Sequence, residues 1–213
     1  MYSFDKISKD FIYSAGYCTT LAVKQIIEES KVENASVYVA GSDGLRNELT
    51  AAGVRIINQG VGENNPQMTT EEYGNYKLDP SVVVVIAGVD FHFNYRKLCI
   101  ATLYVTEGKA KFLATNPDRA SGNDQRVIPG GGTVVKAIES ATGMIAPVQG
   151  KPSEGMFNLL CKQHNLENAP RSKFLMVGDN LETDIMFAKN NKMDSLLVLS
   201  GVTHDSKADK VIN

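Results

Sequence analysis

The chain has 213 residues, of which 43% are hydrophobic, and a formal net charge of −2. This length and composition fit one large or two small globular domains with a hydrophobic core. The charge gives no basic surface for nucleic acid or for an anionic membrane. Because no apolar run approaches the roughly 20 residues of a membrane span, and the first residues lack the apolar segment of a signal peptide, we expect a cytoplasmic protein without nucleic-acid or membrane partners.

Three cysteines are present, which is an odd number, and they are widely spaced in the sequence: Cys18, Cys99 and Cys161. Each lies among apolar neighbours. This pattern predicts buried free thiols and not a disulfide framework or a zinc site.

Short strands and helices alternate in the first part of the chain. Residues 11–13 favour a short strand, and the residues that follow, up to 30, favour a helix. Residues 37–40 and 45–52 predict a strand followed by a helix. The glycines between them do not form a Gly-x-Gly-x-x-Gly fingerprint, so a dinucleotide loop is disfavoured.

The next elements surround the most strand-like run of the chain, residues 82–87. A short strand at residues 54–57 and a polar loop at residues 58–80 precede it. A helix at residues 96–106 and a strand at residues 112–114 follow it.

Asp90 and His92 come just after the strand at 82–87 and imitate the entry to a carboxylate site. The alternative is that Asp90 is a turn or cap residue before the next helix. We favour the turn or cap.

Residues 119–126 are short and polar and predict a joint between domains. After the joint, Thr133 is the expected N-cap of a helix, and a second helix is expected over residues 156–164. The apolar runs 174–177 and 196–199 predict two buried strands.

Three glycines, Gly130 to Gly132, precede the first of these helices. Backbone amides in such a loop can bind phosphate. No Lys-Ser/Thr pair follows, as it does in a Walker loop, so we favour an ordinary tight loop.

Two carboxylates follow the predicted strand at 174–177. Asp179 lies at its carboxyl end, where open α/β sheets bind ligands, and Asp184 opens a helix-like run. Two such oxygen ligands suit Mg²⁺, which takes its remaining ligands from water and phosphate. An alternative stays open at this point, in which Asp179 is a turn residue and Asp184 a helix N-cap.

Two motifs together resemble the haloacid dehalogenase superfamily, within it the phosphoglycolate, pyridoxal-phosphate and 4-nitrophenyl phosphatase branch. They are Gly-Lys-Pro-Ser-Glu-Gly-Met-Phe at 150–157 and Val-Gly-Asp-Asn-Leu-Glu-Thr-Asp-Ile at 177–185. Other segments occur in the order typical of that branch, so the resemblance covers nearly the whole chain: residues 37–45, 90–98, 114–118 and 129–132.

The resemblance implies a role for each of five side chains. Lys151 is expected to be the catalytic lysine that neutralises phosphate and nucleophile, and Asp179 and Asp184 are expected to form the Mg²⁺ site. Asn116 and Asp118 are expected to bind substrate near the edge of the cap.

The resemblance also implies the fold class, an α/β protein with a partial Rossmann-like haloacid dehalogenase core and an inserted α/β cap. Residues 1–34 are expected to be a remnant of the core, residues 35–120 the cap, and residues 121–213 the C-terminal part of the core.

This sequence departs from the family pattern in one respect that bears on catalysis. The family's nucleophile lies in an Asp-x-Asp motif, and no Asp-x-Asp occurs in these 213 residues. The chain begins at about the third core strand and stops short of the family's last strand and helix. We therefore expect a fragment or a shortened relative.

Two functions follow as expectations. The first is a Mg²⁺-dependent phosphatase acting on a phosphorylated small molecule, incomplete and inactive as this chain alone. The second is a non-catalytic subunit of a larger complex, and in either case we expect a homo-oligomer or a protein complex.

Overall fold

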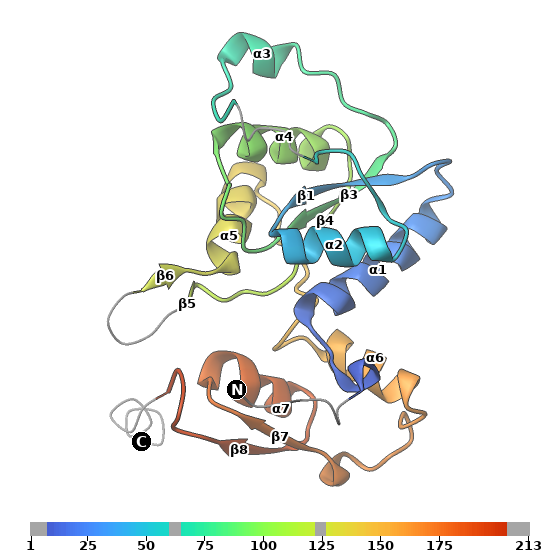
Figure 1. Cartoon of the computed structure of the whole chain (residues 1–213), viewed down its shortest axis with the longest axis vertical. Helices are drawn as coiled ribbons and strands as arrows, with labels where there is room; N and C mark the ends of the chain where they lie inside the picture. The colour runs from blue at the N-terminus through green and yellow to red at the C-terminus, as the bar shows by residue number, and fades with distance from the viewer. Residues whose placement is uncertain (1–7, 60–64, 122–126, 204–213) are drawn as a thin grey trace. The chain divides into compact units, whose positions relative to one another are not determined.

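The computed structural model describes residues 8–59, 65–121 and 127–203 (Figure 1). The chain divides into two compact units. One unit comprises residues 19–149, and the other comprises residues 1–18 together with 150–213.

No helix in the described ranges has the length and apolar character needed to cross a membrane.

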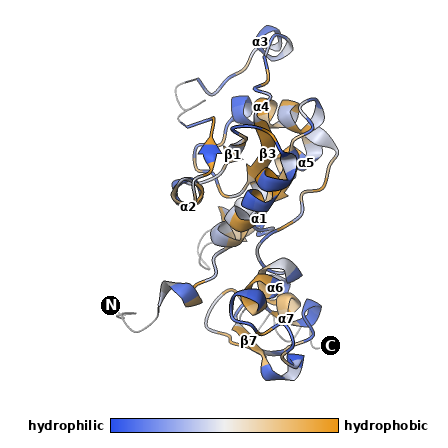
Figure 2. Cartoon of the chain, turned by 90° about the vertical axis from the view of Figure 1, so that its right-hand side faces the viewer, coloured by the Kyte–Doolittle hydropathy of each residue, from blue (hydrophilic) through white to orange (hydrophobic). Residues whose placement is uncertain are grey.

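A four-stranded parallel sheet forms the centre of the unit at residues 19–149, with the order β2-β1-β3-β4. Its strands are β1 (Ser36–Ala40), β2 (Arg55–Ile56), β3 (Val82–Ala87) and β4 (Lys111–Ala114). All four lie at the predicted positions. The apolar character of the inner strands β1 and β3, visible for β3 in Figure 2, follows from burial of a parallel sheet on both faces.

Helices cover both faces of this sheet. On one face, α1 (Ala15–Ser30) and α2 (Asp43–Ala51) pack against Val37 and Val39. On the other face, α4 (Tyr95–Thr106) and α5 (Gly131–Thr142) pack against Tyr38 and Ala40. Successive residues of β1 therefore enter opposite cores, as the pleat of a strand requires.

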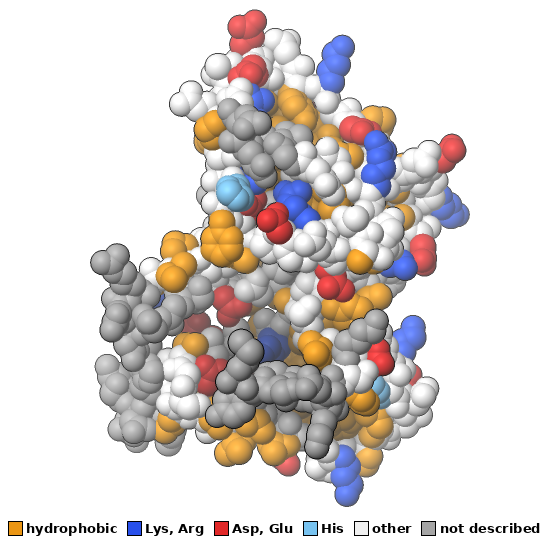
Figure 3. Space-filling model, viewed as in Figure 1, with side chains coloured by type: hydrophobic (Ala, Val, Ile, Leu, Met, Phe, Trp, Pro, Cys, Tyr) orange, Lys and Arg blue, Asp and Glu red, His pale blue; other side chains and the backbone are white. Residues whose placement is uncertain are grey.

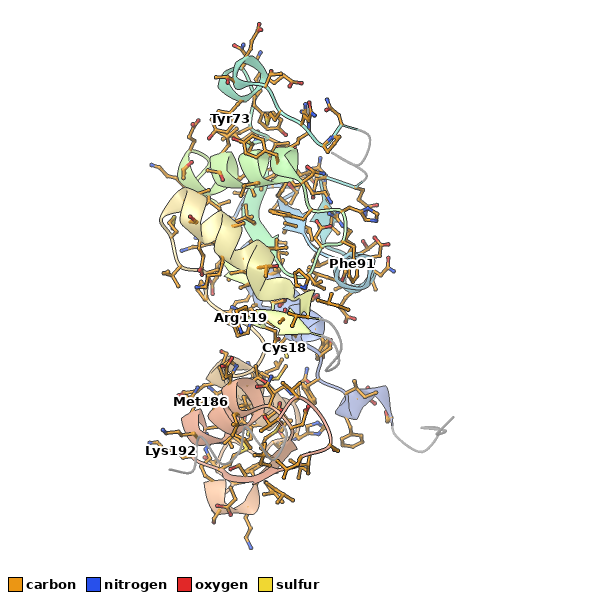
Figure 4. All side chains as sticks on the ribbon, turned by 90° about the vertical axis from the view of Figure 1, so that its left-hand side faces the viewer. Cys18, Tyr73, Phe91, Arg119, Met186 and Lys192 are labelled. Carbon is orange, nitrogen blue, oxygen red and sulfur yellow. The ribbon has the colours of Figure 1, made fainter. Side chains whose placement is uncertain are left out.

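A short helix, α3 (Thr70–Gly74), lies within the predicted polar loop. The Thr69 hydroxyl accepts from the Glu72 amide at 3.1 Å, and the Glu72 carboxylate accepts from the Thr69 amide at 2.9 Å. Arg96 of α4 donates to Glu72 at 2.7 Å. Tyr73 packs against the core below α3 (Figure 4).

The expected domain joint contains β5 (Ala120–Ser121), which pairs antiparallel with β6 (Ile128–Pro129) just after the joint. Residues 122–126 of that joint lie outside the described residues.

The predicted N-cap of α5 is wrong. The N-cap is Gly130, and the Thr133 hydroxyl donates back to its carbonyl oxygen at 2.7 Å. The reason is close packing, because a Cβ added to Gly132 would lie 2.2 Å from the carbonyl oxygen of Pro117. The glycines therefore bring the first turn of α5 onto the loop that follows β4.

In the second unit, the parallel strands β7 (Leu175–Gly178) and β8 (Asp194–Leu197) pair with each other. Helices α6 (Glu154–Gln163) and α7 (Met186–Asn190) supply Phe157, Cys161 and Phe187 to its core. Cys18, Cys99 and Cys161 are buried and free, as predicted.

The predicted strand at residues 11–13 is not formed. The 3₁₀ turn Lys9–Phe11 lies there instead, followed by Tyr13, whose hydroxyl donates to Gln163 at 2.6 Å. A side-chain contact with α6 thus replaces sheet pairing in this segment.

The prediction that the last two strands are buried is also wrong. Leu175 is 59% exposed, Val177 52% and Leu196 52%. Phe174 and Met176 pack against the core, so the β7 segment buries one set of alternating side chains and leaves the other at the surface, where Figure 3 shows hydrophobic side chains. In β8, three of the four residues are exposed.

The compact units differ from the expected domain limits after residues 34 and 120. The unit with the four-stranded sheet extends over residues 19–149. Val23 of α1 and Ile138 of α5 are both fully buried in the clusters that cover this sheet. The sequence indicated these helices but not the sheet on which they pack.

Candidate functional site

The candidate site lies where β7 ends. Gly178 is the last residue of the strand, and Asp179 follows it. The Asn180 side chain then accepts from the Glu182 amide at 2.9 Å and caps the π-helical turn Leu181–Ile185, which carries Asp184. A Cβ added to Gly178 would lie 2.3 Å from the Cβ of Asp184, so glycine allows this turn to fold back onto the strand end.

Both carboxylate oxygens of Asp184 contact neighbouring donor groups. Its Oδ2 accepts from the amides of Asp179 at 3.1 Å and Asn180 at 3.2 Å. Its Oδ1 contacts Nζ of Lys151 at 2.6 Å. The residue is 4% exposed, so these partners replace water around its charge.

Lys151 precedes α6, whose N-cap is Ser153. Its side chain is 39% exposed, in contrast to the buried carboxylate with which it pairs. The lysine can therefore keep contact with Asp184 while presenting positive charge to a ligand in solvent.

Asp179 is half-buried, and its two carboxylate oxygens differ. Oδ2 accepts from the Val202 amide at 2.6 Å. For Oδ1, the described part of the chain provides no hydrogen-bond donor. Asp179 is therefore the acid in this cluster with an oxygen free for a cation.

The oxygen donors of this site fit Mg²⁺ with Asp179 as the direct ligand. No group of three or more His, Cys, Asp or Glu side chains with metal-binding geometry occurs in the described ranges. Mg²⁺ commonly uses one or two carboxylates and completes its octahedron with water and phosphate oxygens. Asp179 suits direct binding, whereas Asp184 suits orientation of the Asp179 and Asn180 backbone.

The alternative in which Asp184 is a helix N-cap is wrong. Asn180 caps the helical turn, and Asp184 lies inside it. Its side chain still accepts from backbone amides, but these belong to the two residues that follow β7.

Asn116 and Asp118 form a separate cluster after β4, in the other unit. The Asn116 amide donates to Asp118, and the Thr115 hydroxyl donates to Oδ1 of Asn116 at 2.7 Å. The Asp118 carbonyl oxygen accepts from the Gly132 amide at 2.8 Å. These contacts stiffen the loop against the start of α5.

Asp90 is a turn residue, as favoured from the sequence, and also half of a buried ion pair. Its Oδ1 accepts from the His92 amide at 2.9 Å, and Nζ of Lys97 lies 2.9 Å from Oδ2. The two side chains are 2% and 3% exposed. Phe91 follows Asp90 in the sequence and is 79% exposed (Figure 4).

Sequence reasoning missed the part that Gly201 and Val202 play at the site. The Val202 amide binds Asp179, and a Cβ on Gly201 would lie 1.9 Å from Oδ2 of Asp179. The sequence shows a glycine after the apolar run at residues 196–199, and such a glycine can mark a close approach of the backbone to another group. The sequence does not show that this group is Asp179.

Comparison with known proteins places these residues among phosphatase sequences. The HAD-hydrolase-like family model matches residues 148–213. The 4-nitrophenylphosphatase of Schizosaccharomyces pombe is 32% identical over 197 residues, covering 92% of this chain and 64% of that protein. Phosphoglycolate phosphatase 2 of Arabidopsis thaliana is 34% identical, covering 94% of this chain and 65% of that protein. The chain thus spans less than two thirds of the length of these curated relatives.

The chain also resembles solved structures over most of its length. The p-nitrophenyl phosphatase of Archaeoglobus fulgidus matches with a TM-score of 0.75 and 26% identity, over 97% of this chain and 68% of that one. A hypothetical protein of Pyrococcus horikoshii matches with a TM-score of 0.70 and 30% identity, over 96% and 69%. A glycerol phosphate phosphatase of Mycobacterium tuberculosis in complex with magnesium matches with 0.65 and 25%, over 89% and 49%.

Proposed function

Because this chain belongs to the haloacid dehalogenase-like hydrolases, in the branch of the 4-nitrophenyl and phosphoglycolate phosphatases, we propose that it carries the charge-neutralising half of a Mg²⁺-dependent phosphomonoester phosphatase. The observation that supports this most is the Lys151–Asp184 contact at 2.6 Å, with Asp184 also bound to the Asp179 amide. One buried carboxylate thereby holds a lysine and the backbone of a second acidic residue at one strand end.

Each residue of this cluster has a separate role in the proposal. Lys151 neutralises the phosphate, Asp179 binds Mg²⁺, and Asp184 holds both in place. Mg²⁺, when bound, offsets the negative charge of the phosphate.

The proposal gives this chain no nucleophile. In covalent phosphate transfer a carboxylate attacks phosphorus, and the 213 residues contain no Asp-x-Asp motif to supply it. Loss of an essential nucleophile lowers turnover by orders of magnitude while leaving part of the binding. We therefore infer that the chain alone binds metal and phosphate without hydrolysing phosphomonoesters.

We assign the unit of residues 19–149 to the cap and the unit with β7 and β8 to the core. Asn116 and Asp118 would then be the cap residues that bind a phosphorylated small molecule. Their fixed loop after β4 supports this, since parallel sheets present ligand-binding groups at the carboxyl ends of their strands.

Binding measurements test the site itself. Inorganic phosphate should bind in the presence of Mg²⁺, and Lys151→Met and Asp179→Asn should each weaken binding by about tenfold or more. Lys136→Met is the control, because the Lys136 side chain is 73% exposed and pairs with Glu139 in the unit of residues 19–149. Equal effects of all three substitutions would contradict the proposed site.

A second function, a non-catalytic subunit, is favoured by the exposed apolar residues of β7 and β8. The intact mass of the protein purified from its source separates the two functions. A longer protein that includes an Asp-x-Asp motif supports the enzyme. A protein of 23.2 kDa, the mass of these 213 residues, supports the subunit.

A further inference from the structure

A loop at residues 200–203 holds Asp179 from a position later in the chain. The Val202 amide donates to Oδ2 of Asp179 at 2.6 Å, across 23 residues of sequence. The Thr203 amide donates to the Asp179 carbonyl oxygen at 3.0 Å. The loop therefore fixes both the carboxylate and the backbone of Asp179.

Gly201 makes this contact possible by leaving space. A Cβ added there would lie 1.9 Å from Oδ2 and 2.5 Å from Cγ of Asp179. The glycines with positive φ in the described ranges are Gly53 and Gly143, so the backbone of Gly201 is open to other residues. Space, and not backbone conformation, requires glycine at this position.

The contact selects one oxygen of the carboxylate. Because the Val202 amide occupies Oδ2, rotation of the carboxylate would break a short hydrogen bond to a backbone group that cannot follow. Oδ1 is then the oxygen to which the described residues supply no donor. Hydrogen bonds that orient a metal-binding side chain commonly change metal affinity by about 10- to 100-fold.

We propose that the loop of residues 200–203 is a positioning element for the metal site, in which the Val202 amide holds Oδ2 of Asp179 and leaves Oδ1 for the cation. This inference rests on the proposed role of Asp179 in binding Mg²⁺. It assigns a function to Gly201 and Val202, which act through Asp179 and touch neither metal nor substrate.

The test measures Mn²⁺ binding by electron paramagnetic resonance of the free ion, so it needs no turnover. Gly201→Ala should weaken Mn²⁺ binding about tenfold or more. Gly155→Ala is the matched control in the same unit, because its Cβ would meet only Ser153 Oγ at an ordinary 3.5 Å. Val202→Ala should also bind as the wild type does, since its side chain is 51% exposed and its amide remains.

A double variant separates positioning from general damage. If Gly201 acts through Asp179, Gly201→Ala should weaken binding in the wild type but add nothing to Asp179→Asn. Wild-type affinity in a folded Gly201→Ala protein would overturn the positioning role alone. Absence of Mn²⁺ binding by the wild type would overturn the metal role of Asp179, and this inference with it.

A backbone variant covers the case in which Gly201→Ala does not fold. Semisynthesis can replace the Val202 amide by an ester, which deletes the N–H donor and retains the side chain. Weaker Mn²⁺ binding is the expected result. Unchanged binding would overturn the proposal.

Discussion

Asp184 and Asp179 lie five residues apart but have different surroundings. Asp184 is 4% exposed and accepts from two amides and Lys151, whereas among the described residues only the Val202 amide donates to the half-buried Asp179 side chain. Removing a buried charge that satisfies several partners leaves those partners unpaired. The two acids should therefore differ in their contribution to stability.

We predict that Asp184→Ala lowers the free energy of unfolding by about 2 to 4 kcal/mol. Asp179→Ala should lower it by about 1 kcal/mol or less, because one hydrogen bond is lost. Urea denaturation followed by circular dichroism measures both. An equal or larger loss for Asp179→Ala would contradict the roles assigned to the two residues.

The three cysteines give a second prediction at this scale. Burial raises the pKa of the Cys18 thiol to about 11, so at pH 8 little thiolate is present. Cys99 and Cys161 are 8% and 2% exposed. Ellman's reagent should react slowly with the native chain at pH 8 and release three equivalents in denaturant. Reaction of one thiol within the mixing time would contradict the burial.

The same raised pKa makes stability depend on pH. The folded state holds the Cys18 proton more tightly than the unfolded state, whose thiol titrates near 9.0. This contribution to stability is fully present below pH 9 and is lost as the pH rises toward about 11. Cys18→Ala should reduce that loss in urea denaturation between pH 8.5 and 10.5.

At the scale of single residues, the sequence indicated candidate site residues but not which residues they contact. Gly-Asp at the end of an apolar strand indicated Asp179, and Lys151 was identified only through the family motif. The pairing of Lys151 with Asp184 joins residues 33 positions apart, and the Val202 contact joins residues 23 apart. Local patterns contain no information about such distant partners.

Among the elements, α5 shows how packing sets a helix start. Gly130 and Gly132 bring its first turn against the backbone of residues 117 and 118, and Gly131 brings it against Asn116 and the backbone of residues 88 and 89. Thr133 has a good capping side chain, yet the helix begins before it. Tertiary contact thus replaces the local signal used to predict the N-cap.

We predict that Gly132→Ala lowers the free energy of unfolding by about 2 to 3 kcal/mol, because its Cβ would collide with the Pro117 carbonyl oxygen. Gly74→Ala in α3 is the control, since nothing lies within 4 Å of its Cβ and its φ is not positive. That variant should be as stable as the wild type or slightly more so. Thermal denaturation compares them, and similar losses in both would contradict the packing argument.

Strands were predictable where both faces of a sheet are covered. The apolar run of β3 coincides with the strand formed, because every side chain in it enters a core. α3 was missed because five residues are too few for a helical period and its stability comes from a capping box. The strand expected near Phe11 failed because three apolar residues do not distinguish a strand from a turn.

At the scale of the whole molecule, the two units differ in how well their sheets are covered. The four-stranded sheet packs against helices on both faces. In the other unit, Leu175, Val177 and Leu196 are more than half exposed on a sheet of two parallel strands. Parallel sheets are normally covered on both sides, and two strands alone are marginally stable.

We predict that the purified chain associates as its concentration rises, because exposed apolar strands favour pairing with other copies or with a partner. Leu175→Lys should weaken association measured by light scattering after size-exclusion chromatography. Ile145→Lys is the control, since Ile145 is 78% exposed but lies in the other unit. A monomer at all concentrations, or equal effects of both substitutions, would contradict this account.

The central claim is that these 213 residues hold the metal and phosphate but lack the group that attacks phosphorus. Hydrolysis of 4-nitrophenyl phosphate with Mg²⁺, by a purified chain whose mass is confirmed as 23.2 kDa, tests it most directly. We predict that 4-nitrophenol appears no faster than in the same buffer without protein. Robust Mg²⁺-dependent hydrolysis that is lost on Asp179→Asn would contradict the claim and require a nucleophile within the chain.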